Sequence, residues 1–183
     1  MVYNQNISMQ KNPYKLAGAY HWDWYTQRQR YIRHVQFLKR WVGEKNTIDI
    51  GAGDGLITHE LAIRGVDNNA YAVKLAAEKG VKIDLGDASR LPYKKEQFDS
   101  ALMSDTLEYL RDIKRPLSEA RRVIKKYLYI SLPSAEKFTQ PDHYHYWIPQ
   151  DLVINVENQG FRLAEGPRLK VDRQHYYFKF QKV

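Results

Sequence analysis

The chain contains no cysteine among its 183 residues. Disulfide bonds and zinc sites built on thiolates are therefore excluded, and so is any reaction that needs a thiol nucleophile from the chain itself. Glycine and proline are not enriched, and the sequence shows no repeat or low-complexity segment. Because 43% of the residues are hydrophobic, we expect a folded core, and the length has room for one α/β domain and little more.

Long apolar runs are also absent. No run approaches the ~20 residues that are needed to cross a bilayer. The amino-terminal sequence MVYNQNISMQK lacks the apolar core of a secretion signal. We therefore expect a soluble, cytoplasmic protein without a membrane span.

The formal net charge of +8 is unevenly distributed. Residues 1–45 hold eight Lys and Arg against two acids, and residues 166–183 hold five against one. The stretch between them is slightly acidic by difference. Basic ends of this kind favour an anionic partner such as a nucleic acid, while a solvated basic surface that keeps the protein soluble is the alternative interpretation.

The stretch that organises the chain is residues 47–56, TIDIGAGDGL. Ile48 and Ile50 favour a buried strand, and Asp49 is an acid near its carboxyl end. The turn that follows contains Gly51, Gly53 and Gly55. Without Cβ atoms, such a turn lets a ligand approach the main chain, and the next helix presents unpaired N–H groups there. A tight turn that binds nothing is the alternative interpretation.

A second acid supports a nucleotide site. After a predicted helix over 56–62 and a strand over 63–66 comes Asp67, eighteen positions after Asp49. Neighbouring parallel strands have their carboxyl ends together, so Asp67 is placed to accept both hydroxyls of a ribose. The alternative is that Asp67 only caps the helix that begins near Ala70.

The amino-terminal region predicts three segments. Residues 1–18 are expected to form a loose arm, which leaves 19–183 as a single domain. The run YHWDWY at 20–25 packs four aromatic residues and a histidine together, which suggests a lid over the nucleotide site. An amphipathic helix is predicted over 26–42.

The rest of the chain alternates strand and helix signals before two final strands. We predict helices over 70–79, around 107–110, over 116–126 and over 150–159, and strands over 81–85, 98–103, 127–132, 161–165 and 174–182.

The pattern D-x-G-x-G-x-G at 49–55 resembles the first motif of the class I methyltransferases that use S-adenosylmethionine. A dinucleotide fingerprint, G-x-G-x-x-G, would need glycine where this chain has Leu56. The stretches GDASRLPYKKEQFD, MSDTLEYL and PLSEARRVIKKYLYISLPS then follow in order. They are similar to the small-molecule type of the family, such as the enzymes of ubiquinone and menaquinone synthesis. The resemblance covers about residues 20–165 and is specific for the family but not for a substrate.

The resemblance and the order of the elements imply an α/β fold. We expect a Rossmann-like three-layer sandwich with a seven-stranded, mainly parallel sheet in the order 3-2-1-4-5-7-6. Only the seventh strand should be antiparallel, because the last two strand signals have no helix between them.

The resemblance also implies a cofactor, S-adenosyl-L-methionine, and a set of residues that bind it. The carbonyl of Gly51 and the amides near Gly53 and Asp54 would hold the methionine end, with Asp49 beneath them. Asp67 would bind the ribose.

The remaining binding roles follow from the same resemblance. Asp87 and Ala88, with Leu91 beside them, would contact the adenine, and Ser104 would close the site near the sulfonium through its carbonyl. For Asp87 a plain turn residue after Gly86 is the alternative.

Two departures from related enzymes narrow the reaction. Methyltransferases that act on exocyclic amines of nucleic acid bases carry an N/D-P-P-aromatic motif after the fourth strand, where this chain has Met103-Ser104-Asp105-Thr106. Aminopropyl transferases place an acid-rich turn there, and this chain offers only Asp105 and Glu108. The lack of cysteine also removes the covalent route to carbon 5 of a pyrimidine and radical chemistry on an iron–sulfur cluster. Transfer to oxygen or nitrogen remains.

The loop at 134–149 is expected to cover the acceptor, and it holds the candidate general bases His143 and His145. His21 and Glu108 are weaker candidates. A surface loop whose histidines have no chemical role is the alternative. We assign no metal-binding residues.

The sequence therefore predicts a methyltransferase that modifies an oxygen or nitrogen of an acceptor, most simply a small molecule. Two alternatives stay open: an enzyme that acts on RNA or protein, and a non-catalytic module that binds S-adenosylmethionine or nucleic acid.

Overall fold

The computed structural model describes residues 12–134, 143–168 and 175–183. The amino-terminal half contains α1 (Pro13–Ala17), α2 (Tyr20–Gln27), α3 (Gln29–Trp41), β1 (Thr47–Ile50), α4 (Leu56–Leu61), β2 (Arg64–Asp67), α5 (Ala70–Glu78) and β3 (Ile83–Leu85). The carboxyl-terminal half contains β4 (Phe98–Ser104), the 3-10 helix η1 (Leu107–Tyr109), α6 (Lys114–Val123), β5 (Ile124–Pro133), α7 (Pro149–Glu157), β6 (Phe161–Arg168) and β7 (His175–Lys182).

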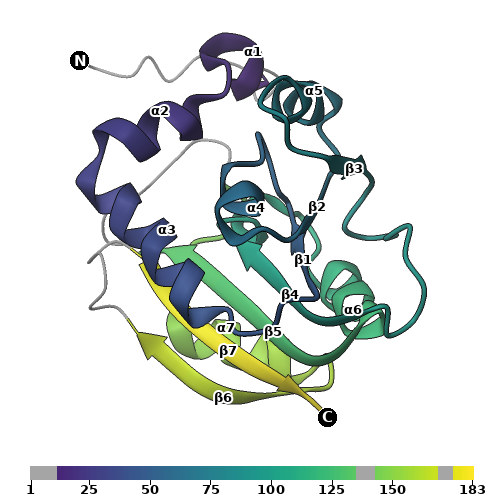
Figure 1. Cartoon of the computed structure of the whole chain (residues 1–183). Helices are drawn as coiled ribbons and strands as arrows, with labels where there is room; N and C mark the ends of the chain where they lie inside the picture. Colours follow the sequence, from purple (N-terminus) through teal and green to yellow (C-terminus); the bar gives the residue numbers. More distant parts are fainter. Residues whose placement is uncertain (1–11, 135–142, 169–174) are drawn as a thin grey trace.

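The strands form one sheet in the order β3-β2-β1-β4-β5-β7-β6 (Figure 1). The pairs β1–β2, β1–β4, β2–β3 and β4–β5 are parallel, whereas β7 pairs antiparallel with both β5 and β6. The predicted α/β fold, strand order and single antiparallel strand are confirmed. The carboxyl ends of β1 to β4 therefore meet at one edge of the sheet, and the strand-end acids gather there.

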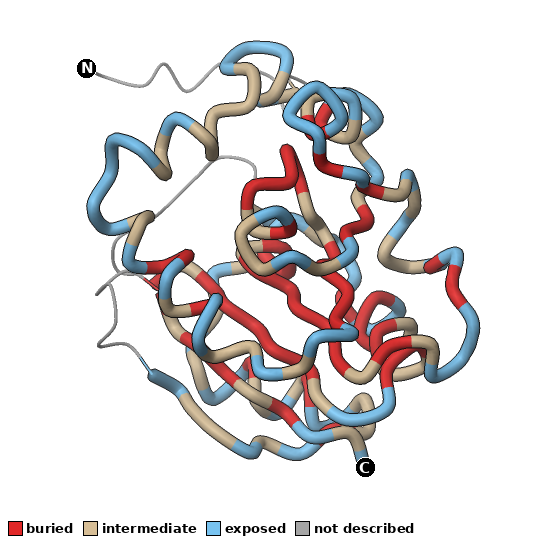
Figure 2. The backbone as a smooth tube through the Cα atoms, viewed as in Figure 1, coloured by how far each residue is buried: buried red, intermediate tan, exposed pale blue. Residues whose placement is uncertain are grey.

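Helices cover both faces of the sheet, which gives the three layers that were predicted (Figure 1). On one face, α6 and α7 bury apolar residues such as Leu117 and Leu152 against the strands. On the other, Leu38 of α3 packs on Leu102 and Tyr129. Figure 2 shows the buried residues along the central strands, between exposed outer surfaces of the helices.

The amino-terminal elements differ from the prediction in a way that matters for the site. The helix predicted over 26–42 is instead two helices, because Arg28 has an extended backbone (φ −113°, ψ 102°) between α2 and α3. The aromatic run at 20–25 belongs to α2. Within the expected arm, residues 1–11 lie outside the described residues, and Pro13–Ala17 is helical rather than loose. The domain boundary at residue 19 stays a prediction.

Two other elements are shorter than predicted. The helix expected around 107–110 is only the 3-10 turn η1, because Leu110 is already extended (φ −96°, ψ 127°). The helix expected over 116–126 ends at Val123, and Ile124 begins β5. None of the helices in the described ranges is long and apolar enough to cross a membrane. The cytoplasmic location stays a prediction.

The packing of α3 on β4 gives a stability prediction. Leu102 is fully buried, with 0% of its surface exposed, so Leu102→Ala should lower the free energy of unfolding by about 2–5 kcal/mol. Leu85 is 59% exposed, so the matched control Leu85→Ala should change it by less than about 0.5 kcal/mol. Urea unfolding measures both. Equal losses in the two variants would contradict the placement of Leu102 in the core.

Candidate active site

The glycine turn after β1 curls back onto β2. Gly51 and Gly53 have left-handed backbones, with φ of 84° and 56°, which glycine adopts without strain. The amide N–H groups of Gly51 and Ala52 both donate to the carbonyl of Val66, at 2.9 and 3.1 Å. A Cβ at Gly51 would lie 2.5 Å from the side chain of Thr106, so the carboxyl end of β4 packs directly on this turn.

Asp67 connects the end of β2 to the same turn. One carboxylate oxygen accepts from the amide N–H of Gly53 at 2.8 Å, and the other accepts from that of Asn69 at 2.8 Å. Burial raises the pKa of Asp67, these two hydrogen bonds oppose the rise, and the charge of Asp54 adds to it. The helix cap predicted as the alternative role belongs to Asn69, whose side chain accepts from the amides of Tyr71 and Ala72. Each oxygen of Asp67 keeps a second lone pair, which suits a ribose hydroxyl.

Asp49 lies beneath the turn with only 2% of its surface exposed. Burial raises its pKa to about 7, although Thr58 donates a hydrogen bond to the carboxylate at 2.7 Å and favours the charged form. The charge of Asp67 adds to the rise. A cation close to such a deeply buried acid would stabilise its charged form.

Helix α2 lies over the turn through Asp54. The backbone N–H of His21 donates to one oxygen of this buried carboxylate at 3.0 Å, and Nδ1 of the His21 ring lies 3.1 Å from the other oxygen. Nε1 of Trp22 donates to the carbonyl of Asp54 at 3.0 Å. The hydroxyl of Tyr14 lies so close to Gly53 that it would clash with a Cβ there. His21 and Trp22 of the aromatic run therefore contact the glycine turn, and the role of the run as a lid over the nucleotide site stays a prediction.

The residues expected at the adenine lie after β3. Asp87 is exposed and forms an isolated bridge with Arg90, and its carboxylate accepts from the amide of Ser89 at 2.7 Å. This is the turn role that the sequence allowed as the alternative. Ala88 is half-buried beside it, and Leu91 is buried in the main core. An adenine role for Asp87 and Ala88 stays a prediction.

Ser104 ends β4 next to the glycine turn. The Thr106 hydroxyl lies 3.1 Å from the carbonyl of Ser104 and 3.1 Å from that of Ile50, so it joins the ends of β4 and β1. The Ser104 hydroxyl lies 2.8 Å from that of Ser131. The predicted contact of the Ser104 carbonyl with the sulfonium stays a prediction.

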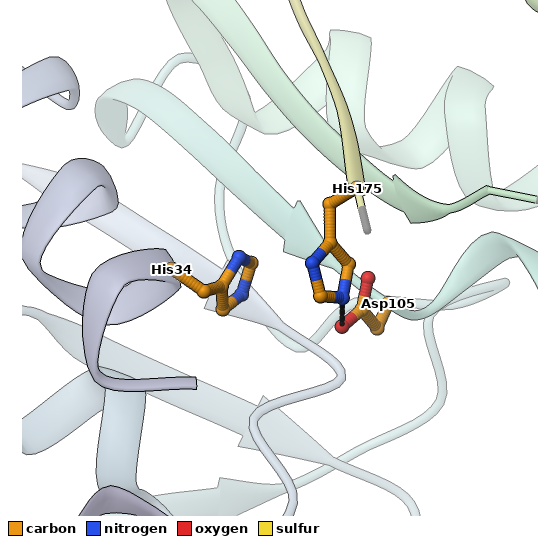
Figure 3. Close-up of side chains that lie close together, drawn as sticks. All are labelled: His34, Asp105 and His175. Carbon is orange, nitrogen blue, oxygen red and sulfur yellow. Dashed lines mark ion pairs between the residues drawn. The ribbon is translucent and has the colours of Figure 1, made fainter. Parts of the chain in front are cut away.

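Beyond Ser104 lies a cluster of His34, Asp105 and His175, shown in Figure 3. Nε2 of His175 lies 3.1 Å from a carboxylate oxygen of Asp105. The rings of His34 and His175 stack with centroids 4.3 Å apart and planes 30° from parallel. Asp105 itself has a left-handed backbone, with φ of 49°, and strained residues of this kind concentrate at functional sites.

The candidate bases His143 and His145 lie elsewhere at this end of the sheet. The His143 ring packs edge-on against Tyr109 with centroids 4.8 Å apart, and the His145 ring packs on Trp147 at 4.8 Å. The amide of His145 donates to the carbonyl of Glu108 at 3.4 Å. Their catalytic role stays a prediction.

Two surface cavities lie near these segments. One, of about 640 Å³, adjoins the loop after Asp67 and contains Lys15 and Lys74 in its wall. The other, of about 440 Å³, includes His145 and Trp147.

Sequence reasoning missed His34 and His175 as site residues. They lie 141 positions apart, one inside an amphipathic helix and one at the start of the last strand. No motif spacing connects them, and only the pairing of β7 beside β5 brings them together.

Comparisons with known proteins agree with this geometry. The model of the methyltransferase domain family matches residues 48–130, from β1 to β5. An uncharacterized protein of Methanocaldococcus jannaschii is 32% identical over 97 residues, which cover 52% of this chain and 47% of that protein. A demethylmenaquinone methyltransferase of Thermobifida fusca is 31% identical over 112 residues, which cover 54% of this chain and 47% of that protein. The chain thus spans about half the length of these relatives.

The fold is also that of a solved S-adenosylmethionine-dependent methyltransferase from Thermotoga maritima. The TM-score is 0.76, and the match covers 93% of this chain and 98% of that one. At 23% identity, this likeness establishes the fold alone.

The buried Asp49 predicts a specific pH dependence. Its pKa is about 7 in the folded protein against 3.8 ordinarily, so the folded state keeps a proton that the unfolded chain releases between these values. The stabilising contribution of Asp49 to the free energy of unfolding is therefore complete below pH 3.8, and it is lost as the pH rises to about 7. The rise of about 3 pKa units makes this loss roughly 4–5 kcal/mol, at about 1.4 kcal/mol per pKa unit.

In Asp49→Asn the side chain is neutral at every pH, so this variant lacks the pH-dependent loss of the wild type. Its free energy of unfolding relative to that of the wild type should therefore rise by a few kcal/mol between about pH 4 and about pH 8. Urea unfolding at both pH values measures the change. Asp99→Asn, which changes a half-buried acid paired with Lys125, is the control. A difference between Asp49→Asn and the wild type that does not vary with pH would refute the assignment.

Proposed function

We propose that this chain, a member of the class I family of S-adenosylmethionine-dependent methyltransferases, transfers a methyl group to an oxygen or nitrogen atom of a small acceptor. The family's cofactor is S-adenosyl-L-methionine, and the residues at the carboxyl edge of the sheet fit it. The acceptor and the acceptor atom belong to the proposal.

The observation that carries the proposal is the set of three carboxyl groups at the glycine turn. Asp49, Asp54 and Asp67 come from the ends of β1 and β2 and from the turn itself. The charge of Asp67 raises the pKa of Asp49, whose rise is mainly due to burial, and the charge of Asp54 likewise adds to the effect of burial on Asp67. A ligand that brings a sulfonium and an ammonium group relieves this repulsion, and hydroxyls of its ribose satisfy the lone pairs of Asp67.

The chain's own residues would then position the reactants. The glycine turn and Asp67 fix one end of the donor, while α2 covers the turn and excludes water. Bound S-adenosylmethionine supplies a methyl group that is already activated on a sulfonium. Alignment of donor and acceptor is worth about 7–11 kcal/mol of barrier lowering, which makes positioning the main task of the protein.

Aromatic rings supply the surface that we propose for the acceptor. Tyr20 packs on Trp24 with centroids 4.9 Å apart, Trp24 packs edge-on against Tyr31 at 5.7 Å, and Tyr31 reaches His34 at 5.8 Å. This row leads from the glycine turn towards the carboxyl end of β4. Stacking faces of this kind suit a planar, partly apolar molecule. The Thermobifida fusca relative is named a demethylmenaquinone methyltransferase, which supports a small-molecule acceptor.

The cofactor site gives the first test of the proposal. Asp67→Ala should weaken S-adenosylmethionine binding by more than about tenfold, because a charged acceptor of hydrogen bonds is lost. Asp99→Ala, at the opposite end of β4, should bind as the wild type does. Calorimetry measures both affinities. Equal affinities for Asp67→Ala and the wild type would remove Asp67 from the site.

The acceptor gives a second test, because the basic ends of the chain favour an RNA acceptor instead. We expect a labelled methyl group to pass from S-adenosylmethionine into a small-molecule extract and not into total RNA. Any RNA binding that depends on phosphate contacts should fall steeply with salt. Methyl transfer into RNA, with tight binding that weakens in this way, would replace the small acceptor by RNA.

A further inference from the structure

The cluster of His34, Asp105 and His175 lies next to the proposed site of transfer. Asp105 directly follows Ser104 at the carboxyl end of β4, and its amide donates to the carbonyl of Ser131 at 3.0 Å, which fixes it there. His175 begins β7, two strands away in the sheet order, and 9% of its surface is exposed. Figure 3 shows the ion pair between His175 and Asp105, with the His34 ring to one side of the His175 ring.

The geometry fits proton transfer better than metal binding. One potential ligand atom from each residue lies within 4.8 Å of the others. However, the rings of His34 and His175 stack only 30° from parallel, so their in-plane lone pairs do not converge on one point. In addition, Nδ1 of His34 lies 2.8 Å from the Tyr177 hydroxyl and Nε2 lies 3.2 Å from the Ser104 hydroxyl. A metal ion would have to displace one of these contacts.

The surroundings distinguish the two histidines. His34 is fully buried, and a neutral imidazole, with one donor and one acceptor nitrogen, matches its two hydroxyl partners. His175 faces the carboxylate of Asp105, which favours a charged ring. Two stacked imidazolium rings would repel each other, so a proton on His175 requires His34 to stay neutral. Within the described part of the chain, titratable groups that face His175 include Asp105 after β4, His34 on α3 and Tyr177 on β7.

Tyr31 connects this cluster to the donor site. Burial raises the pKa of its phenol well above the ordinary value, and the charges of Asp54 and Asp105 add to the rise. The ring also lies 5.8 Å from those of His21 and His34. The Tyr31 side chain therefore lies between Asp54 at the glycine turn and Asp105 beside His175.

We propose that His175 is the general base of the reaction and that Asp105 is its positioning residue. This inference rests on the proposed function. The acceptor's oxygen or nitrogen gives its proton to His175, and its electron pair forms the new bond to the methyl carbon. The carbon–sulfur bond breaks with its electron pair left on sulfur, so the positive charge passes from the sulfonium to the imidazolium. Asp105 holds that charge until the proton leaves to water.

The protonation of the two rings can be measured without an acceptor. In protein labelled with ¹⁵N-histidine, two-bond proton–nitrogen correlation spectra report the state of each ring between about pH 5 and 8. Signals of His175 are assigned with His175→Gln. We expect His175 to take up the proton and His34 to stay neutral. In Asp105→Asn the midpoint for His175 should move to lower pH by about one unit or more.

Kinetics gives the second readout. With hydroquinone, catechol and a primary amine as probe acceptors, His175→Gln should lower kcat by about 10²–10⁴-fold while leaving the affinity for S-adenosylmethionine unchanged. Asp105→Asn should lower kcat less and shift the acid limb of the pH profile in the same direction as the midpoint of His175. His59→Gln, which changes an exposed histidine of α4, is the matched control. Thermal unfolding of each variant checks that it folds.

The outcomes separate the two proposals. If the wild-type protein does not bind S-adenosylmethionine, the proposed function is wrong. The spectra still decide whether His175 and Asp105 form a proton-accepting pair. The inference is overturned if His34 takes the proton, if Asp105→Asn leaves His175 unchanged, or if Zn²⁺ or Mn²⁺ shifts both rings together as a metal site would. It is also overturned if His143→Gln or His145→Gln loses turnover while His175→Gln keeps it.

Discussion

The hydrogen bond from the amide of Gly53 to the carboxylate of Asp67 joins the turn after β1 to the end of β2 at 2.8 Å. The rest of the site depends on it. A left-handed backbone at Gly53 points this amide at Asp67, and the same turn leaves Asp49 buried beneath it. Parallel pairing of β1 with β2 brings the two ends together. The strand-end acids are therefore held in one place by backbone geometry rather than by long, flexible side chains.

This placement has an electrostatic cost that explains the chemistry we propose. Three carboxyl groups around one turn repel one another, and burial disfavours the charge of Asp49 most strongly. A cationic ligand bound at this turn would offset the repulsion, because a nearby positive charge favours the charged form of a carboxylate. The fold alone does not choose the acceptor, because sites rather than folds determine function. The aromatic row on α2 and α3 and the pair of His175 and Asp105 are the parts of this chain that bear on that choice.

Particular elements show where sequence patterns were sufficient. Alternating strand and helix signals, followed by two strands without a helix, together with the family resemblance, predicted the strand order and the antiparallel β7. The break at Arg28 and the short η1 were not predicted, because a continuous amphipathic pattern does not reveal where the backbone becomes extended. Tertiary contacts decide such breaks: α2 is turned so that His21 and Trp22 reach Asp54.

The sequence by itself determined the glycine turn and the acids at the strand ends, because each depends on residues close together along the chain. It also determined that Asp67 would face the turn, since parallel strands place their carboxyl ends side by side. Only the tertiary structure decided that His34, Asp105 and His175 meet. Their contact requires α3 to pack on the sheet and β7 to insert antiparallel beside β5, and no local pattern encodes a contact between residues so far apart in the chain.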